Sequence, residues 1–429
     1  MGADVTSPGY IELLRRKPAF RRLWLTSCLL YTFDWFTIIA MFILAGEASG
    51  GSPLAIAGVL AARSFTFVPC EILVGAAADR WSRRSLMVIA NFFSFVVLIS
   101  FLYLELLNDL FFVYLLSSLL VIGRSLHDPA ATAWVQNICD RDEIITANTM
   151  ISAAWSASLG FGSAIGGWTI AVYGFEAGLL MDSMSFLFAS MVLYTLPHGG
   201  PDHEERKGAN PREIVGDIIE GWVHVFQRPH LRRIMMAKIS WASSGGLQIF
   251  ILVLIGNEAG FGAFETGAAG IGILYMARGF GSGLGPVSAR PLVAKRSLMP
   301  YVIGVALCGA GLGYVTLSYL EWGLATILLV AISHGFSGIS WVTSSSFLMQ
   351  RASKSFMGRV ASMDSLGITL TMGVSTLAGG YILEVGWVTI REALLLSGLI
   401  QVAAGLAWLM IASPREREYI QSENIGQPQ

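Results

Sequence analysis

The chain has 429 residues, of which 54% are hydrophobic and only 13% are charged, and its mean hydropathy is +0.62. A soluble globular protein carries about 25% charged residues, so this composition excludes an ordinary soluble enzyme and indicates an integral membrane protein. The formal net charge of −1 gives no support to a nucleic-acid partner. The four cysteines show no C-x-x-C or metal-ligand spacing, and we expect no metal and no cofactor.

The apolar segments are long and numerous. The N-terminus is polar and basic as far as Arg22, and the apolar run after it is too long for the core of a signal peptide. Twelve runs of about 20 residues or more can each cross a bilayer as a helix. They lie at 22–46, 54–78, 85–107, 110–135, 144–173, 176–196, 234–257, 266–289, 298–320, 322–349, 357–385 and 390–412. We predict an all-α integral membrane protein with twelve transmembrane helices.

The basic residues are distributed unevenly between the two sides of the predicted bundle. All but four of the 28 lysines and arginines lie in the termini, in the even-numbered connections or at the run ends beside them, with Lys238 counted among those just after the central connection. The exceptions are Arg391, in an odd-numbered connection, and three arginines inside runs: Arg63, Arg124 and Arg278. Because basic loops stay in the cytoplasm, both termini are predicted to be cytoplasmic, in a bacterial inner (plasma) membrane.

A polar stretch at 197–211 divides the chain. After it, 211–227 predicts an amphipathic helix on the cytoplasmic surface. Its apolar face is Ile214, Ile218, Trp222 and Val225, and its polar face is Glu213, Asp217, Glu220 and His224. We predict an N-terminal six-helix bundle at 1–196, a linker at 197–231, a C-terminal six-helix bundle at 232–412 and a cytoplasmic tail at 413–429.

The two halves show an internal repeat at an offset of 213 residues. The residues Met150, Ser152, Gly160, Gly166, Gly167 and Val172 match Met363, Ser365, Gly373, Gly379, Gly380 and Val385. A repeated Gly-x5-Gly-Gly spacing favours close helix crossing at equivalent places. This pattern predicts two pseudo-symmetric bundles related by an axis along the membrane normal, which is a transporter architecture.

A short basic connection between the second and third runs carries a recognisable motif. It reads Gly75-Ala-Ala-Ala-Asp79-Arg80-Trp-Ser82-Arg83-Arg84. This spacing resembles the signature loop of the major facilitator superfamily, with Ser82 where that family usually has glycine. The resemblance implies alternating access, with a cytoplasmic gate formed by Gly75, Asp79, Arg80, Arg83 and Arg84, and by Arg359 across the cytoplasmic face.

Further stretches are similar to the branch of macrolide efflux proteins and enterobactin exporters. They are Asp128-Pro-Ala-Ala-Thr-Ala with Asn148, Gly160 to Gly167 with Asp182-Ser-Met-Ser-Phe186, Glu220-Gly-Trp with Arg228-Pro-His-Leu-Arg232, and Gly358-Arg359-Val360. Antiporters of the superfamily tend to have a Gly-Pro pair in the fifth helix, whereas this chain has Gly162-Ser163-Ala164. The resemblance implies proton-driven export. The missing pair leaves a non-transporting sensor or assembly protein as the alternative.

Charged residues inside the runs are the candidate substrate and coupling residues, because intramembrane charges usually face the bundle interior with a partner. They are Asp34, Arg63, Glu71, Arg124, Asp128 and Arg278. Arg63 and Glu71 share a helix face, and Arg124 and Asp128 can simply pair with each other. For Asp182 and Asp364 we favour helix capping, and for His334 a hydrogen-bonded packing role.

Asp34 is the strongest coupling candidate, since aromatic neighbours favour the neutral form of its carboxyl, which can carry a proton. A fixed salt bridge between helices is the alternative. Aromatic side chains that could line a cavity are Trp35, Phe36, Trp155, Trp241 and Trp341. Interfacial or lipid-facing positions are the ordinary alternative for them.

The sequence therefore predicts a secondary active transporter that exports a small organic molecule, driven by the proton gradient. The substrate is expected to be a drug, a siderophore or another metal chelate, with a lysolipid as an alternative. Arginines beside acids favour an anionic or zwitterionic molecule. We expect a monomer in the lipid bilayer and no enzyme activity, since P-loop, H-E-x-x-H and G-x-S-x-G motifs are absent.

Overall fold

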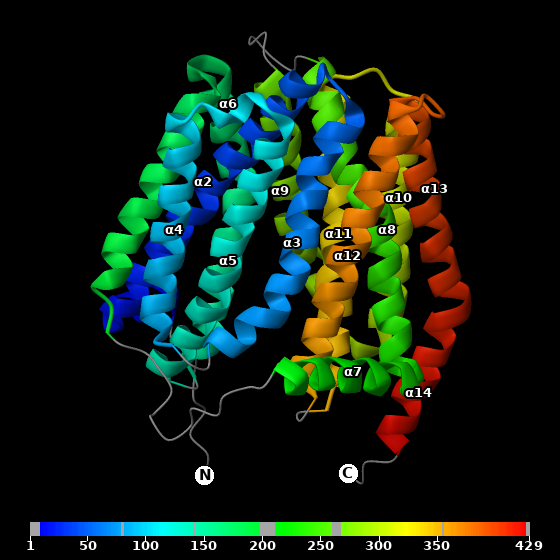
Figure 1. Cartoon of the computed structure of the whole chain (residues 1–429). Helices are drawn as coiled ribbons and strands as arrows, with labels where there is room; N and C mark the ends of the chain where they lie inside the picture. Colours follow the sequence, from blue (N-terminus) through cyan, green and yellow to red (C-terminus); the bar gives the residue numbers. More distant parts are fainter. Residues whose placement is uncertain are drawn as a thin grey trace.

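The computed structural model describes residues 9–78, 81–140, 142–197, 211–259, 267–353 and 356–425, and every regular element in these ranges is a helix. The N-terminal half contains α1 (Tyr10–Arg16), α2 (Pro18–Ser49), α3 (Pro53–Ala78), α4 (Arg83–Tyr103), η1 (Leu106–Asn108), α5 (Leu110–Ile138) and α6 (Ile144–Tyr194). The remainder contains α7 (Pro211–Gln227), α8 (Pro229–Ala259), α9 (Gly267–Val293), η2 (Arg296–Leu298), α10 (Met299–Leu317), α11 (Leu324–Arg351), α12 (Met357–Glu384), α13 (Ile390–Ala407), η3 (Trp408–Ala412) and α14 (Ser413–Ile425). The long helices run side by side, and α7 lies across one end of them (Figure 1).

Ten of the described helices are long and apolar enough to cross a membrane. One of them, α6, has 51 residues and bends back at Gly174, where φ is 83° and ψ is 167°, a conformation that glycine adopts readily. Its arms, 144–173 and 175–194, run in opposite directions (Figure 1). With both arms of α6 and with α9, which has 27 residues, these ranges contain twelve membrane-length segments. The predicted all-α fold class is confirmed.

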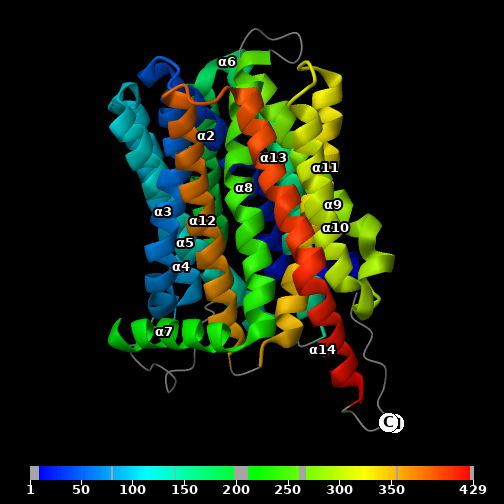
Figure 2. The same ribbon diagram turned by 90° about the vertical axis from the view of Figure 1, so that its right-hand side faces the viewer.

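Local sequence signals fix several helix ends. Pro18 begins α2, and Gly50 ends it with a left-handed φ of 68°. Asp109 caps α5 by accepting a hydrogen bond from the Phe111 amide at 2.8 Å. The helix α13 does not stop at residue 412, because a π-helical turn carries it into α14, which extends beyond the end that holds α7 (Figure 2). The segment predicted as a tail is therefore helical up to Ile425.

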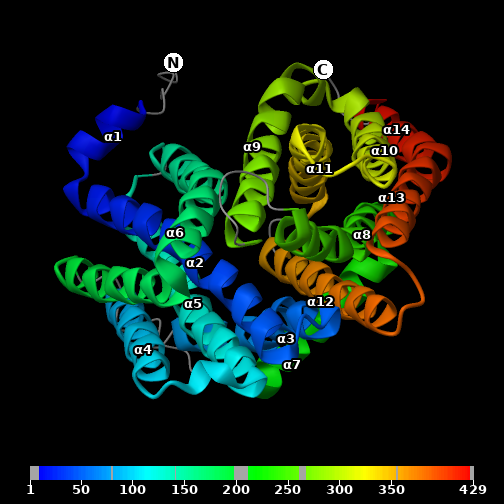
Figure 3. The same ribbon diagram turned by 90° about the horizontal axis from the view of Figure 1, so that it is seen from above.

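The helices form two groups that lie side by side when the molecule is viewed along the helix axes (Figure 3). The largest buried apolar cluster joins the groups at the end opposite α7, with Ile39 of α2, Phe250 of α8 and Leu274 of α9 among its members. Near α7 the buried clusters are separate, one around Trp134 in the N-terminal half and one around Leu348 in the C-terminal half. Shared packing therefore holds the halves together at the end far from α7.

The repeated glycines occupy equivalent places in the two halves. A methyl group on Gly167 would lie 2.5 Å from the Ala268 carbonyl oxygen on α9, and one on Gly380 would lie 2.5 Å from a side-chain atom of α3. Their neighbours Gly166 and Gly379 face α2 and α8 respectively. The Gly-Gly pairs therefore permit close contacts within each half and between the halves.

Candidate functional site

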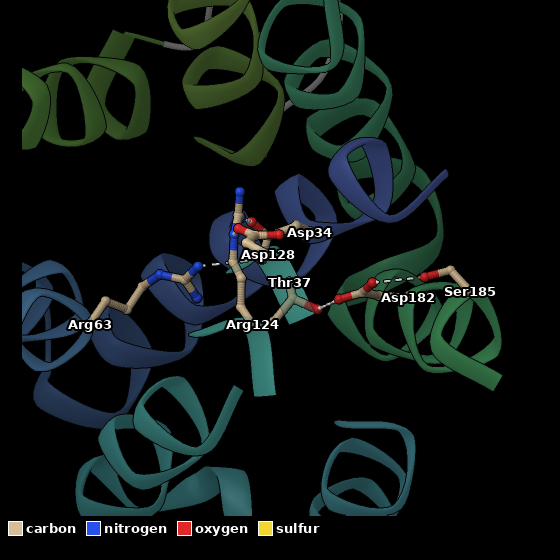
Figure 4. A network of polar contacts seen from close by, with 7 residues as sticks. All are labelled: Asp34, Thr37, Arg63, Arg124, Asp128, Asp182 and Ser185. Carbon is tan, nitrogen blue, oxygen red and sulfur yellow. Dashed lines mark hydrogen bonds and ion pairs between the residues drawn. The ribbon is translucent and has the colours of Figure 1, made fainter. Parts of the chain in front are cut away.

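Asp34 lies in the middle of α2, between arginines from two other helices (Figure 4). The Nη2 atom of Arg63 on α3 is 3.3 Å from Asp34 Oδ1, and Nη1 of Arg124 on α5 pairs with Oδ2. Arg124 also donates from Nε to Asp128 Oδ2 at 3.2 Å. Arg124 therefore pairs with the local Asp128, as the sequence allowed, and also with Asp34, a partner that the sequence analysis did not propose.

The cluster has equal numbers of acidic and basic side chains, but one of its hydrogen-bond donors has no partner. It contains two carboxylates and two guanidinium groups, and the Asp34 side chain is 16% exposed. The Nη1 atom of Arg63 is buried and has no hydrogen-bond partner. The guanidinium of Arg124 lies 5.5 Å from the centre of the Tyr31 ring. The open donor on Arg63 can bind an acceptor group that the chain itself does not supply.

A second carboxyl group is linked to the cluster through a hydroxyl. Thr37, one turn beyond Asp34 on α2, donates to Asp182 Oδ2 at 2.5 Å, and Ser185 donates to Oδ1 at 3.1 Å (Figure 4). Asp182 is fully buried, and no basic partner for it occurs in the described part of the chain. The predicted capping role is wrong, because Asp182 lies inside the second arm of α6 and contacts side chains of α2 and α6.

A cavity of about 40 Å³ adjoins Asp34, Arg124 and Asp128. His127 and Asn91 also line it, with His127 Nδ1 2.9 Å from Asn91 Nδ2. This volume is enough for one buried water molecule, whose share of the liquid is about 30 Å³. A water molecule there would contact polar groups on α2, α4 and α5.

Arg278, on α9 of the other half, has no carboxylate partner among the described residues. Its guanidinium lies 5.3 Å from the centre of the Tyr275 ring, which is 5.4 Å from the ring of Trp35 on α2. Arg278 is therefore connected to the helix of Asp34 through two aromatic side chains. His334 is buried and shares a hydrogen bond of 2.8 Å with the Tyr314 hydroxyl, a packing contact of the predicted kind.

The structure reveals a charged residue that the sequence analysis placed wrongly. Lys238 lies inside the predicted run 234–257 but was counted with the basic residues of the central connection, whereas α8 begins at Pro229 and Lys238, 3% exposed, lies well within this membrane helix. Its ammonium group pairs with Asp364 of α12, donates to Ser345 at 2.7 Å and lies 4.7 Å from the Trp341 ring centre. The position of Lys238 four residues into the predicted apolar run was the available signal. Asp364 is thus an ion-pair partner and not the predicted helix cap.

Glu71 lies near this pair, where α3 meets α12 of the other half. It accepts a hydrogen bond of 3.1 Å from Ser365, the residue after Asp364. A cavity of about 180 Å³ is lined by Lys238, Asp364 and Ser365. Although Glu71 and Arg63 lie on one helix, the structure does not bring the Glu71 carboxylate into the Asp34 cluster.

The aromatic candidates fall into different environments. Trp241 and Trp341 have ring centres 5.3 Å apart and lie beside Lys238, and Trp341 lines the 180 Å³ cavity. Trp35 contacts Tyr275 across the halves. Phe36 is 1% exposed and packs against Gly166, so it is a packing residue, and Trp155 is 43% exposed.

The basic residues of the predicted gate contact nearby backbone and α7. Arg83 donates to the Ala133 carbonyl at 2.7 Å, Arg84 donates to that of Leu196 at 3.1 Å, and Arg359 pairs with Glu220 of α7 at 2.8 Å. The surroundings of three other gate residues lie outside the described part of the structure: Gly75, Asp79 and Arg80.

The helix α7, which we call the strap helix, coincides with the amphipathic helix predicted at 211–227, but one face assignment was wrong. His224 does not face away from the bundle; it is 6% exposed and stacks on Phe356, with ring centres 3.8 Å apart. Ile219 and Val223 are exposed instead. On a helix with about 3.6 residues per turn, His224 is adjacent to Gly221 and Val225, which face the bundle.

Comparisons with known proteins agree with this fold. The family model described as Major Facilitator Superfamily matches residues 23–363. An uncharacterized MFS-type transporter of Bacillus subtilis (strain 168), YfiS, is 22% identical over 394 residues, covering 88% of this chain and 89% of that protein.

The solved structure of the nucleoside transporter NupG is similar, with a TM-score of 0.70 and 16% identity over 91% of this chain and 98% of that one. A peptide transporter POT in complex with sulfate has a TM-score of 0.73 and 14% identity over 92% of this chain and 94% of that one. The chain belongs to the Major Facilitator Superfamily and is a membrane transporter.

Proposed function

We propose that this chain is a secondary active transporter that couples proton movement to the export of a small organic molecule. The observation that carries the proposal is the position of Asp34 between Arg63 and Arg124, at the middle of α2. Protonation of Asp34 removes the charge that holds both guanidinium groups. Since an unpaired charge inside a membrane protein costs several kcal/mol, the arginines must then find other partners or move with α3 and α5.

The substrate is proposed to carry an anionic group. Arg63 has a buried donor without a partner, and Arg278 has no carboxylate partner in the described residues. Trp35 of α2 contacts Tyr275 of α9, the helix of Arg278, and the two rings offer a surface for an apolar or aromatic part of the molecule. These contacts come from both halves, as alternating access requires.

The direction of transport depends on whether binding of the substrate favours or opposes binding of the proton. Export against an inward proton gradient requires that substrate and proton exclude each other. A positively charged group that replaces Arg63 on Asp34 competes with a proton for the same carboxylate. A zwitterion, with its cationic group on Asp34 and its anionic group on the free arginine donors, therefore meets the requirement for export. Amine-bearing drugs and chelators belong to this class.

A second candidate function is proton co-transport of a purely anionic molecule, which is favoured because Arg278 has no carboxylate partner among the described residues. An anion that draws Arg63 away from Asp34 makes protonation of Asp34 easier, so anion and proton bind together. The pH dependence of substrate affinity distinguishes the two functions. For exchange the affinity rises as the pH is raised, and for co-transport it falls.

The test uses purified protein in liposomes, with the internal pH recorded during a screen of candidate zwitterions and anions. The wild type is expected to show a substrate-dependent proton flux that Asp34→Asn abolishes. Asp109→Asn is the matched control, because it makes the same substitution at the cap of α5. Substrate movement without proton flux would exclude coupling at Asp34. The absence of counterflow in the wild type would support the sensor alternative.

A further inference from the structure

Burying the ion pair of Lys238 and Asp364 inside a membrane helix bundle costs desolvation free energy. Lys238 is 3% exposed and the Asp364 side chain is 10% exposed. Replacing such a buried pair by apolar residues is often neutral or stabilising, so its presence is not explained by stability. Ionisable groups at this depth usually serve a function. The pair is separate from the Asp34 cluster, which lies in the other half.

One oxygen of the Asp364 carboxyl group accepts no hydrogen bond. One oxygen, Oδ2, receives the Lys238 ammonium group, whereas Oδ1 is buried and has no hydrogen-bond partner. The ammonium group is already satisfied by Asp364, Ser345 and the Trp341 ring. The adjoining cavity of about 180 Å³ has room for several water molecules, which could deliver a proton to Oδ1.

A second carboxylate lies on the neighbouring side of α12. Glu71 of α3 accepts a hydrogen bond from Ser365 and has no basic partner in the described residues. Ser365 follows Asp364 directly, and α3 also touches α8, the helix of Lys238. Among the described residues that line the cavity, Lys238 and Asp364 are the titratable ones; α11 supplies Trp341 and Ser345, and α7 brings Gly221 to Met363.

We propose that Asp364 is a second proton-binding residue, and that Lys238 changes partner from Asp364 to Glu71 when Asp364 is protonated. The proton forms an O–H bond at Oδ1 of Asp364, no other covalent bond changes, and Lys238 keeps its charge. The new pair ties α8 to α3 across the two halves near α7. The proton-binding part rests on the proposed proton-coupled function, but the exchange of partners can be measured without transport.

The first experiment is a double-mutant cycle of thermal stability on the purified full chain, with Asp364→Asn, Glu71→Gln and the double variant. Each single variant leaves Lys238 one carboxylate, so each is expected to lower Tm only modestly. The double variant leaves a buried charge without a partner and should lose at least twice the sum of the single losses. Additive losses would overturn the exchange.

The control is the triple variant, in which Lys238→Met removes the charge from the double variant. It is expected to regain most of the lost Tm. A double variant that cannot be purified, with a triple variant that can, gives the same support. A triple variant that is no more stable than the double variant, or that cannot be purified, would overturn the proposal.

The second experiment measures protons moved per substrate in liposomes. Asp364→Asn is expected to lower this ratio by one proton while transport continues. An unchanged ratio would overturn the role of Asp364 in proton binding. A wild type without any proton flux would instead overturn the proposed function, while the stability cycle would still decide the exchange of partners.

Discussion

The two halves share a helix framework but differ in the charges that they enclose. The N-terminal half holds Asp34 among partly exposed charged side chains from three helices, with a small cavity beside them. The C-terminal half holds one deeply buried pair, Lys238 with Asp364, and elsewhere Arg278 without a carboxylate partner among the described residues. Equivalent glycines in α6 and α12 make similar close contacts in the two halves, whereas the buried charged residues differ between the halves.

This difference indicates separate tasks for a common scaffold. Close packing at Gly167 and Gly380 leaves no room for a larger side chain, which explains why both halves have glycine there. Charged side chains inside a membrane protein are costly and are retained where they act. The N-terminal cluster can change its bonding when one proton binds, and the C-terminal pair adds a site near the strap helix.

The largest expected effect tests the N-terminal cluster. Asp34→Asn should lower proton-coupled transport by about 100-fold or more, because both arginines lose their shared carboxylate. Asp128→Asn should cost only a few-fold, since Asp128 is partly exposed and pairs with Arg124 one turn away. Initial rates in liposomes measure both variants, and near-equal losses would mean that Asp34 has no special role.

The next effect tests the C-terminal pair. Lys238→Met alone should destabilise the fold by about 3–5 kcal/mol, because it leaves Asp364 buried without its cation. Lys238→Met with Asp364→Asn should be close to neutral, since both charges are removed. Tm of the detergent-purified variants provides the measurement. If the double variant is as unstable as the single one, the pair stabilises the fold through more than charge compensation.

A smaller effect is expected from substitutions of Arg278 in the C-terminal half. Arg278→Met should raise KM for a substrate with an anionic group by about 10-fold, equivalent to about 1.4 kcal/mol of binding. Arg278→Lys should recover part of this loss, because the charge remains but the planar donor fork does not. Competition binding of each variant with anionic and neutral compounds decides the question. An equal loss for neutral compounds would assign Arg278 to packing.

The smallest effect concerns the strap helix, which packs against the C-terminal half through His224. Burial, and secondarily Arg228, lowers the pKa of His224 below its ordinary value of about 6.5. The neutral imidazole therefore adds stability that is present above this value and is lost as the pH falls through the folded-state pKa. Between pH 7.5 and 5.5, Tm should fall less for His224→Phe than for the wild type. Equal slopes would show that His224 does not dock α7.

The helices, the bend in α6 and the candidate charged residues follow from local sequence signals. Long apolar runs suffice for the spans, Gly174 permits the backbone conformation that divides α6, and Asp34, Arg63 and Arg124 are recognisable because charges in apolar runs are rare. These signals are local, and each can be read within one helix or one turn.

Which charged groups meet depends on the three-dimensional packing of the helices. Asp34 and Arg124 are 90 residues apart, and Glu71 and Ser365 are 294 apart, so no local pattern connects them. Lys238 was counted with the central connection because it lies close to the start of the predicted run 234–257, and its partner Asp364 is 126 residues away in the chain. His224 was assigned to the wrong face for a related reason: the partner that buries it, Phe356, lies on another segment of the chain.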